Sequence, residues 1–175
     1  MNKAFAVLYR SDMARYSDSG EGYVRRFLYY LRKCQTTRNR WLKAYYRFRF
    51  KRIKTMHGIE IPYTTQIGKG LYIGHPYNIT INADAVLGEN CNIHKGVTIG
   101  QENRGKRKGS PIIGDCVWIG INAVVVGNIR VGNDVLIAPN SYVNCDVPDH
   151  SIVFGNPCVI KHSDCATEHY ITRKV

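Results

Sequence analysis

The sequence predicts an all-β solenoid preceded by a short helical region, and three observations support this fold class. From Ile67 to Val143 an aliphatic residue recurs every six residues, at twelve in-phase positions with two interruptions. Glycine, asparagine or aspartate follows most of these residues, as in "IGDCVW". Before residue 55 the apolar residues have helical spacing, with lysine and arginine between them. A period of six is incompatible with a helix, in which apolar residues recur about every 3.6 positions.

Each six-residue unit is expected to be a short strand followed by a sharp turn. The aliphatic residue and the small residue two positions earlier point inward, and Gly, Asn or Asp tolerates the positive φ of a turn. Repetition at a fixed period is the signature of a solenoid. The aliphatic series is Ile67, Ile73, Ile81, Leu87, Ile93, Ile99, Ile113, Ile119, Val125, Val131, Ile137 and Val143.

The region before residue 55 is expected to form two helices, separated near "QTTRN". Thr36, Thr37 and Asn39 are candidate caps, because short polar side chains satisfy free backbone groups at helix ends. The apolar residues at helical spacing are Phe27, Leu28 and Leu31 in the first helix and Trp41, Tyr45 and Phe48 in the second.

The whole net charge of +12 lies in this helical region. Between Arg25 and Lys54 there are twelve Lys or Arg and no Asp or Glu, whereas the other thirteen cations match thirteen carboxylates. Such a segment suits an anionic membrane surface or a nucleic acid, but no nucleic-acid-binding motif is present and no such partner is expected. We favour a helical cap on the first coil or on a neighbouring subunit, with peripheral contact at the inner face of a membrane as the alternative.

Length and composition indicate one sizeable core. The 175 residues are 44% hydrophobic, and no apolar run approaches the roughly 18 residues that span a bilayer. The first residues lack a secretory h-region, so a cytoplasmic location is expected. The six cysteines show no C-x-x-C pair or other metal spacing, so no metal site is expected.

The stretch "DVPDHSIVFGNPCVIK", residues 146–161, resembles the V-P-x-x-S-x-V-x-G-x-P-A element that closes hexapeptide-repeat acyltransferases. With the repeat, it makes the chain similar to the left-handed parallel β-helix acyltransferases, in the serine acetyltransferase branch. The resemblance implies a left-handed β-helix of about four coils and a homotrimer with active sites between subunits. The expected regions are a basic helical region (1–54), the β-helix (55–161) and a C-terminal tail (162–175).

His75 is the candidate catalytic base. The repeat gains two residues directly after it and eight between Ile99 and Ile113, and insertions in a solenoid form loops at corners, where chemistry is placed. Acyl transfer to a hydroxyl needs a base of near-neutral pKa, usually histidine. The family has its catalytic histidine in a D-H-x-x-G stretch at the place of "GHPYN", so Gly74 replaces the aspartate and Asn78 the glycine. A histidine that merely completes a turn is the alternative.

Glu60, in "GIEIP", matches the acidic residue that orients the family's catalytic histidine. One coil is about eighteen residues, so Glu60 can lie beneath His75 and fix its tautomer; a surface glutamate is the alternative. His94, one coil above, either contacts substrate or lies on the outer face, and His57 is expected to be structural. We therefore expect His94 and Asn78 among the substrate-binding residues.

The long loop "GQENRGKRKGSP" departs from the family's G-G-T-G-K-x-x-G-x-R-H-P, in which the Arg-His pair helps to hold the amino-acid acceptor. Gly109 and Ser110 replace that pair. A carboxylate acceptor needs a fixed cation, which makes Arg107, with Ser110, a substrate-binding candidate. The pattern is similar to capsule and exopolysaccharide O-acetyltransferases, which keep the first histidine and lose the pair.

The resemblance implies acetyl-CoA as the donor, with its pantetheine in a groove between coils. Gly120, Ala123 and Ala138 match the turn positions that meet it, and one of their backbone N–H groups is a candidate oxyanion donor. The phosphates need cations, for which Lys106, Arg107, Lys108 and Lys161 are candidates.

The sequence therefore predicts an acetyl-CoA-dependent O-acetyltransferase that acts on a saccharide hydroxyl in surface polysaccharide synthesis. The alternative within this class is a serine O-acetyltransferase of cysteine biosynthesis. The alternative from another class is a non-catalytic hexapeptide scaffold that binds an anionic partner through residues 25–54.

Overall fold

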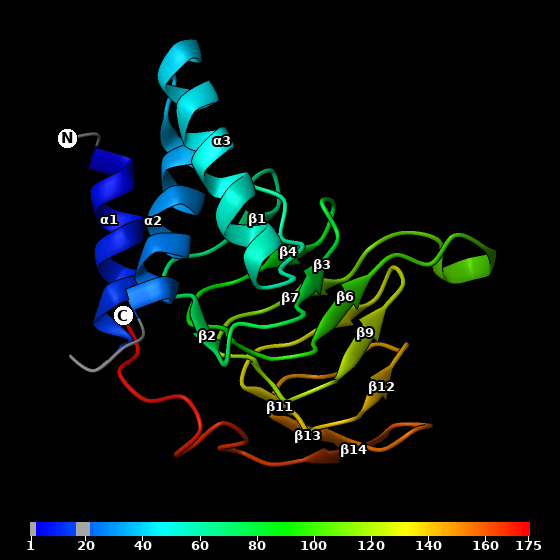
Figure 1. Cartoon of the computed structure of the whole chain (residues 1–175). Helices are drawn as coiled ribbons and strands as arrows, with labels where there is room; N and C mark the ends of the chain where they lie inside the picture. The colour runs from blue at the N-terminus through cyan, green and yellow to red at the C-terminus, as the bar shows by residue number, and fades with distance from the viewer. Residues whose placement is uncertain (1–2, 17–21) are drawn as a thin grey trace.

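The chain winds into a three-sided parallel β-helix with helices packed at its first coil (Figure 1). The computed structural model describes residues 3–16 and 22–175. The parts of the predicted helical region at 1–2 and 17–21 lie outside the described residues. Among residues 3–16 and 22–175, none of the helices combines the length and the apolar composition that a membrane span requires.

Successive short strands enter three sheets in turn, so that three strands make one coil. The first sheet contains β1 (Gln66–Ile67), β4 (Val86–Leu87), β7 (Ile112–Ile113) and β10 (Arg130–Val131). The second contains β2 (Tyr72–Gly74), β5 (Asn92–His94), β8 (Trp118–Ile119), β11 (Val135–Ile137), β13 (Ser151–Phe154) and β14 (Val159–His162). The third contains β3 (Thr80–Ile81), β6 (Thr98–Gly100), β9 (Val124–Val126) and β12 (Tyr142–Val143).

The predicted aliphatic series forms the core of the β-helix. All twelve residues are buried, with at most 8% of the surface of any one exposed. The strand register stacks them in three columns, one per sheet; in the second sheet Ile73 lies beside Ile93, and Ile119 beside Ile137. Burial of one such side chain contributes about 1.5–3 kcal/mol, so the columns supply much of the stability. The predicted solenoid is confirmed.

The polar residues after the strands form the corners, also as predicted. Between the second and third sheets, Gly96 and the asparagines at the same place in the neighbouring coils have φ between 53° and 72°. Their backbone N–H groups donate to carbonyls of the preceding coil, for example from Asn122 to Lys95 at 3.0 Å. Gly and Asn adopt this left-handed conformation at low cost. These corner residues are Asn78, Gly96, Asn122 and Asn140.

Three helices, one more than predicted, precede the solenoid: α1 (Lys3–Ala14), α2 (Gly22–Thr36) and α3 (Arg40–Met56). Asn39 caps α3 as predicted, since its side chain accepts hydrogen bonds from the backbone N–H groups of Trp41 and Leu42. The predicted apolar residues of α2 are fully buried. Those of α3 are not, since Trp41 is 75% exposed and Phe48 59% exposed. The reason is that α3 packs through other side chains, chiefly Phe50.

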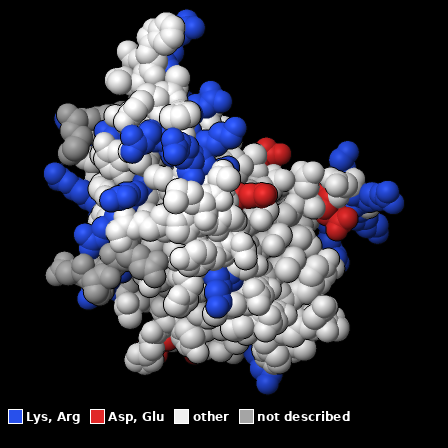
Figure 2. Space-filling model, viewed as in Figure 1, with Lys and Arg blue, Asp and Glu red and all other residues white. Residues whose placement is uncertain are grey.

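Figure 2 shows that Lys and Arg side chains gather over these helices. Asp12 and Arg32, both with fully buried side chains, link α1 to α2 at 2.7 Å. The Arg32 guanidinium also donates to the carbonyl oxygens of Ile67 and Gly68 in the first coil. Asp12 accepts the backbone N–H of Leu71. The helices and the first coil are therefore joined through a buried polar network.

The chain closes the solenoid with an antiparallel pair, β13 and β14, and then returns toward the helices (Figure 1). Asp134 holds this return segment through the backbone N–H groups of Ala166 and Thr167. Val175 ends beside the first coils, where its backbone bonds to the side chain of Asn90. The C-terminal segment thus runs across the second sheet from the last coil to the first.

Candidate active site

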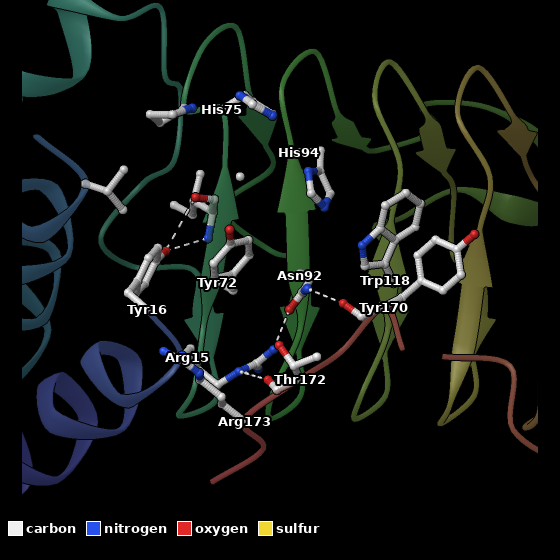
Figure 3. A pocket seen from close by; sticks show the side chains of 14 residues that line it. Arg15, Tyr16, Tyr72, His75, Asn92, His94, Trp118, Tyr170, Thr172 and Arg173 are labelled. Atoms are coloured by element: carbon white, nitrogen blue, oxygen red, sulfur yellow. Dashed lines mark hydrogen bonds between the residues drawn. The ribbon is translucent and has the colours of Figure 1, made fainter. Parts of the chain in front are cut away.

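A cavity of about 520 Å³ lies against the outer face of the second sheet, with His75 on its lining (Figure 3). Four parts of the chain form it: the residues directly after α1, one residue of α2, the first three strands of the sheet with the corner after β2, and the C-terminal segment. Its lining residues are Arg15, Tyr16, Val24, Tyr72, Ile73, Gly74, His75, Pro76, Asn92, His94, Trp118, Tyr170, Thr172 and Arg173.

A row of aromatic rings makes up one wall of the cavity (Figure 3). Tyr16 stacks on Tyr72 with ring centroids 4.7 Å apart. Farther along, Trp118 lies 4.8 Å from the His94 ring and 5.0 Å from that of Tyr170. Tyr72, His94 and Trp118 occupy outward positions on adjacent strands, which is why their rings lie side by side. The wall is a continuous aromatic surface.

Hydrogen bonds hold together the part of the cavity around Arg15, at the bottom of Figure 3. Arg15, almost fully buried, donates to the carbonyl oxygens of Gly70 and Thr172 and to the side chain of Asn92 at 2.7 Å. Asn92 in turn donates to the carbonyl oxygen of Tyr170. The arginine thereby ties α1, the second sheet and the C-terminal segment together, so this wall is built before any ligand binds.

His75 begins the widened corner that the sequence marks with two extra residues. It follows β2 with a φ of 55°, and its carbonyl accepts the N–H of Tyr77 at 2.8 Å. Asn78 then takes the corner position that Gly96 holds one coil later. The extra residues therefore lift His75 out of the regular corner, and its side chain is exposed at the rim of the cavity.

The ring of His94 lies close to that of His75, with centroids 6.5 Å apart. Its Nε2 atom is buried and has no hydrogen-bond partner among the described residues. Strand pairing places His94 directly beside Gly74, and a Cβ atom at residue 74 would lie 2.5 Å from Nδ1 of His94. The imidazole thus occupies the space that a side chain at position 74 would need. This explains why glycine stands where the family has aspartate.

Burial, together with a smaller contribution from the charge of the nearby His75, lowers the pKa of His94 to about 4. Because the unfolded chain binds this proton near pH 6.5, unfolding takes up a proton between these values. The free energy of unfolding is therefore unaffected by protonation of His94 above pH 6.5 and decreases as pH falls from 6.5 toward 4.

We expect the free energy of unfolding of the wild type to fall by on the order of 1–3 kcal/mol more than that of His94→Gln between pH 7.5 and 4.5, measured by urea unfolding. Equal losses in the two proteins would contradict this.

Glu60 lies in the coil below His75, as predicted, where its backbone pairs with Thr80. Its side chain is exposed and lines a different cavity, between α3 and the third sheet, together with Arg47 and Lys54. No hydrogen bond joins Glu60 to His75 in the described structure, so the orienting role stays a prediction. His57 stacks on Tyr23 at 3.3 Å, in keeping with the structural role expected for it.

Two of the candidate coenzyme-binding residues, Gly120 and Ala138, lie along the same corner as His75. Gly120 and Ala138 follow His94 in one outward column, and most of this column lacks bulky side chains. The backbone N–H groups of both residues, however, donate to backbone carbonyl oxygens, those of Ile137 and Val153. The N–H group of Ala123 donates to the carbonyl oxygen of Gly120. These bonds contradict the expectation that one of the three stabilises an oxyanion, because each donor is already used in the solenoid.

The long loop forms the next corner, between the third and first sheets. Glu102 and Gly109 pair across its base, and a short 3₁₀ turn, η1 (Gly105–Arg107), makes its tip. Ser110 donates to the side chain of Asn82 at 3.1 Å. Within one chain the structure therefore separates Lys106, Arg107, Lys108 and Ser110 from His75, and it places Lys161 on β14.

Several lining residues are absent from the sequence-based prediction. The outward positions of Tyr72 and Trp118 could have been read from the repeat, since each precedes an inward isoleucine. Arg15, Tyr16 and Tyr170 carry no such signal. They reach the cavity because α1 and the C-terminal segment fold back on the second sheet.

The comparisons with known proteins agree with this architecture. Residues 110–145 match the family model described as bacterial transferase hexapeptide (six repeats). A serine acetyltransferase of Staphylococcus aureus (strain Mu50) is 40% identical over 107 residues, which cover 61% of this chain and 50% of the relative. The chain spans half or less of the length of the curated relatives it matches first.

Solved structures extend the similarity beyond the repeat. A serine acetyltransferase from Brucella abortus strain S19 in complex with coenzyme A has a TM-score of 0.77 and 25% identity, covering 94% of this chain and 70% of its own. A serine acetyltransferase from Neisseria gonorrhoeae in complex with serine has a TM-score of 0.69 and 28% identity, and the match covers 89% of this chain and 68% of that protein's chain. The left-handed parallel β-helix is thereby confirmed. These comparisons give no support to a closer resemblance to capsule and exopolysaccharide enzymes.

Proposed function

We propose that this hexapeptide-repeat chain, a homologue of serine acetyltransferases, transfers an acetyl group from acetyl-CoA to an acceptor hydroxyl. The observation that carries the proposal is His75, which stands exposed at the rim of a polar and aromatic cavity. It does so at the one corner of the second sheet that is widened by two residues. A base in that place is what hydroxyl acylation requires.

In the proposed reaction, the oxygen of the acceptor hydroxyl attacks the thioester carbonyl carbon while His75 takes the proton of that hydroxyl. The C–S bond then breaks, and the thiolate of CoA receives the proton from the imidazolium. No acyl-enzyme forms. Glu60 is a positioning residue in this scheme and would favour the imidazolium from the coil below.

The donor would lie along the corner of Gly120 and Ala138, beside His75. Small residues there leave room for a chain such as pantetheine, and a related enzyme is known in complex with coenzyme A. Lys106, Lys108 and Lys161 remain candidates for its phosphates. Because the long loop and His75 lie at successive corners of one chain, a trimer is the arrangement that would bring the loop of one subunit to the His75 of the next.

Two acceptors remain candidates. The relatives are serine acetyltransferases, and one was solved with serine, which favours serine. A saccharide hydroxyl is favoured by the loss of residues that the family associates with the amino-acid acceptor. Asp, Arg and His of the family are replaced here by Gly74, Gly109 and Ser110. Residues 25–54 would then serve as a cap on the first coil, and contact of the exposed α3 side chains with an anionic surface is a secondary proposal.

A thiol-release assay with acetyl-CoA tests the function. We expect release of CoA that depends on an added acceptor, L-serine or a saccharide. Calorimetry of the same protein with acetyl-CoA provides the control for the non-catalytic scaffold. A folded protein that neither binds acetyl-CoA nor releases thiol would contradict the proposal.

A further inference from the structure

We infer that the cavity on the second sheet is the acceptor subsite and that it takes a saccharide ring, which stacks on the aromatic wall with one hydroxyl directed to His75. This inference rests on the proposed acetyl transfer. It adds the chemical class of the acceptor and the residues that recognise it, chiefly Trp118, Tyr170 and His94.

The aromatic wall suits a ring-shaped ligand. A pyranose has an apolar face of C–H groups, and such a face packs on aromatic rings through dispersion. Tyr72 and Trp118 point out of the sheet, and Tyr170, which is 52% exposed, extends the surface from the C-terminal segment. An outward row of rings beside a catalytic base has no use in the core, which the inward isoleucines and valines already fill.

The size of the cavity also fits a ring. Its volume of about 520 Å³ lies within the roughly 300–1,000 Å³ typical of sites for ligands of drug size. One serine molecule would leave most of that volume, including the Trp118 and Tyr170 rings, without contact. A monosaccharide, or the terminal residue of a longer saccharide, can reach from Trp118 to His75.

The charges argue against an α-amino acid. No Asp or Glu of the same chain is among the described residues that line the cavity, so this lining would desolvate an ammonium group without giving it a counter-charge. The Arg15 guanidinium already donates to Gly70, Thr172 and Asn92. Arg173, exposed at the rim, is the other arginine on the lining.

His94 gives the cavity lining a polar group that suits an uncharged acceptor. Its Nε2 atom is buried and unpartnered among the described residues, so a turn of the ring toward the cavity would let it bond to a hydroxyl group, and burial keeps the ring neutral near pH 7. By occupying the space over Gly74, it replaces the carboxylate that the family's aspartate would present there. One exchange therefore removes a charge and adds a neutral hydrogen-bonding group beside His75.

The test combines binding and transfer. Trp41→Phe leaves Trp118 as the sole tryptophan of the two in the chain, and Trp41 lies on exposed α3, away from the cavity. In that background, fluorescence is titrated with the methyl glycosides of glucose, galactose and mannose and with L-serine. Thiol release from acetyl-CoA is measured with the same compounds for the parent, Trp118→Ala and the matched Trp118→Phe.

We expect a glycoside to quench Trp118 and to support thiol release. Trp118→Ala should raise its KM about tenfold with little change in kcat, and Trp118→Phe should restore most of the affinity, because it keeps a ring. Release with L-serine alone, or an unchanged glycoside KM in Trp118→Ala, would overturn the subsite while acetyl transfer stands. Quenching by a glycoside with no thiol release from any compound would instead overturn the acetyl transfer.

Discussion

Replacing His75 by alanine is expected to reduce acetyl transfer by about 10²- to 10⁴-fold, the usual contribution of a general base. The side chain is exposed at the corner after β2, so its removal leaves the core intact. The loss should therefore appear in kcat, with the melting temperature and the circular dichroism spectrum unchanged. Thiol release under saturating acetyl-CoA and acceptor measures it.

Two variants sharpen the assignment of His75. His162, a histidine with a 70% exposed side chain on β14, lies outside the cavity lining, and His162→Ala is the matched control that should keep full activity. Glu60→Gln should lower kcat less than His75→Ala and change the pH profile, if Glu60 orients the base. A His75→Ala protein that retains more than about a tenth of the parent rate would refute general-base catalysis by this residue.

Replacing Asp12 by alanine is expected to destabilise the protein by about 3–5 kcal/mol. The carboxylate lies 2.7 Å from Arg32, both side chains are fully buried, and it also accepts the N–H of Leu71. Without it, a guanidinium would remain buried with no counter-charge. Urea unfolding followed by circular dichroism at a fixed protein concentration measures the change.

Two comparisons identify the cause of that loss. Lys69→Ala breaks an exposed pair with Glu89 and should cost no more than about 1 kcal/mol. The double variant Asp12→Leu with Arg32→Met should recover much of the stability, because it removes both buried charges together. If Asp12→Ala costs as little as Lys69→Ala, the buried pair does not join the helices to the first coil.

The repeat was predictable from the sequence down to single side chains. All twelve aliphatic positions are buried, and they stack in register across three sheets. The reason is that each six-residue unit is bonded to the next coil by backbone groups, so period alone determines which residues point inward. The corner asparagines and the cap at Asn39 followed from local backbone chemistry in the same way.

The helical region was only partly predictable. Helical spacing identified α2 and α3, but it did not show which side chains pack within the chain: the predicted apolar residues of α2 are buried, whereas Trp41 and Phe48 are exposed. Periodicity shows that a face is apolar, not what packs on it. The oxyanion donors were misjudged for a related reason, since the bonds of Gly120 and Ala138 depend on the coil above.

The solenoid, its two widened corners and the place of His75 follow from the order of the amino acids, because these features depend on residues close together along the chain. The surroundings of His75 depend instead on long-range packing. Arg15 and Tyr170 reach the second sheet from opposite ends of the chain, and His94 excludes a side chain at Gly74 across a strand pair. Such contacts form when segments that are distant in sequence pack together, so they cannot be predicted from the pattern of neighbouring residues.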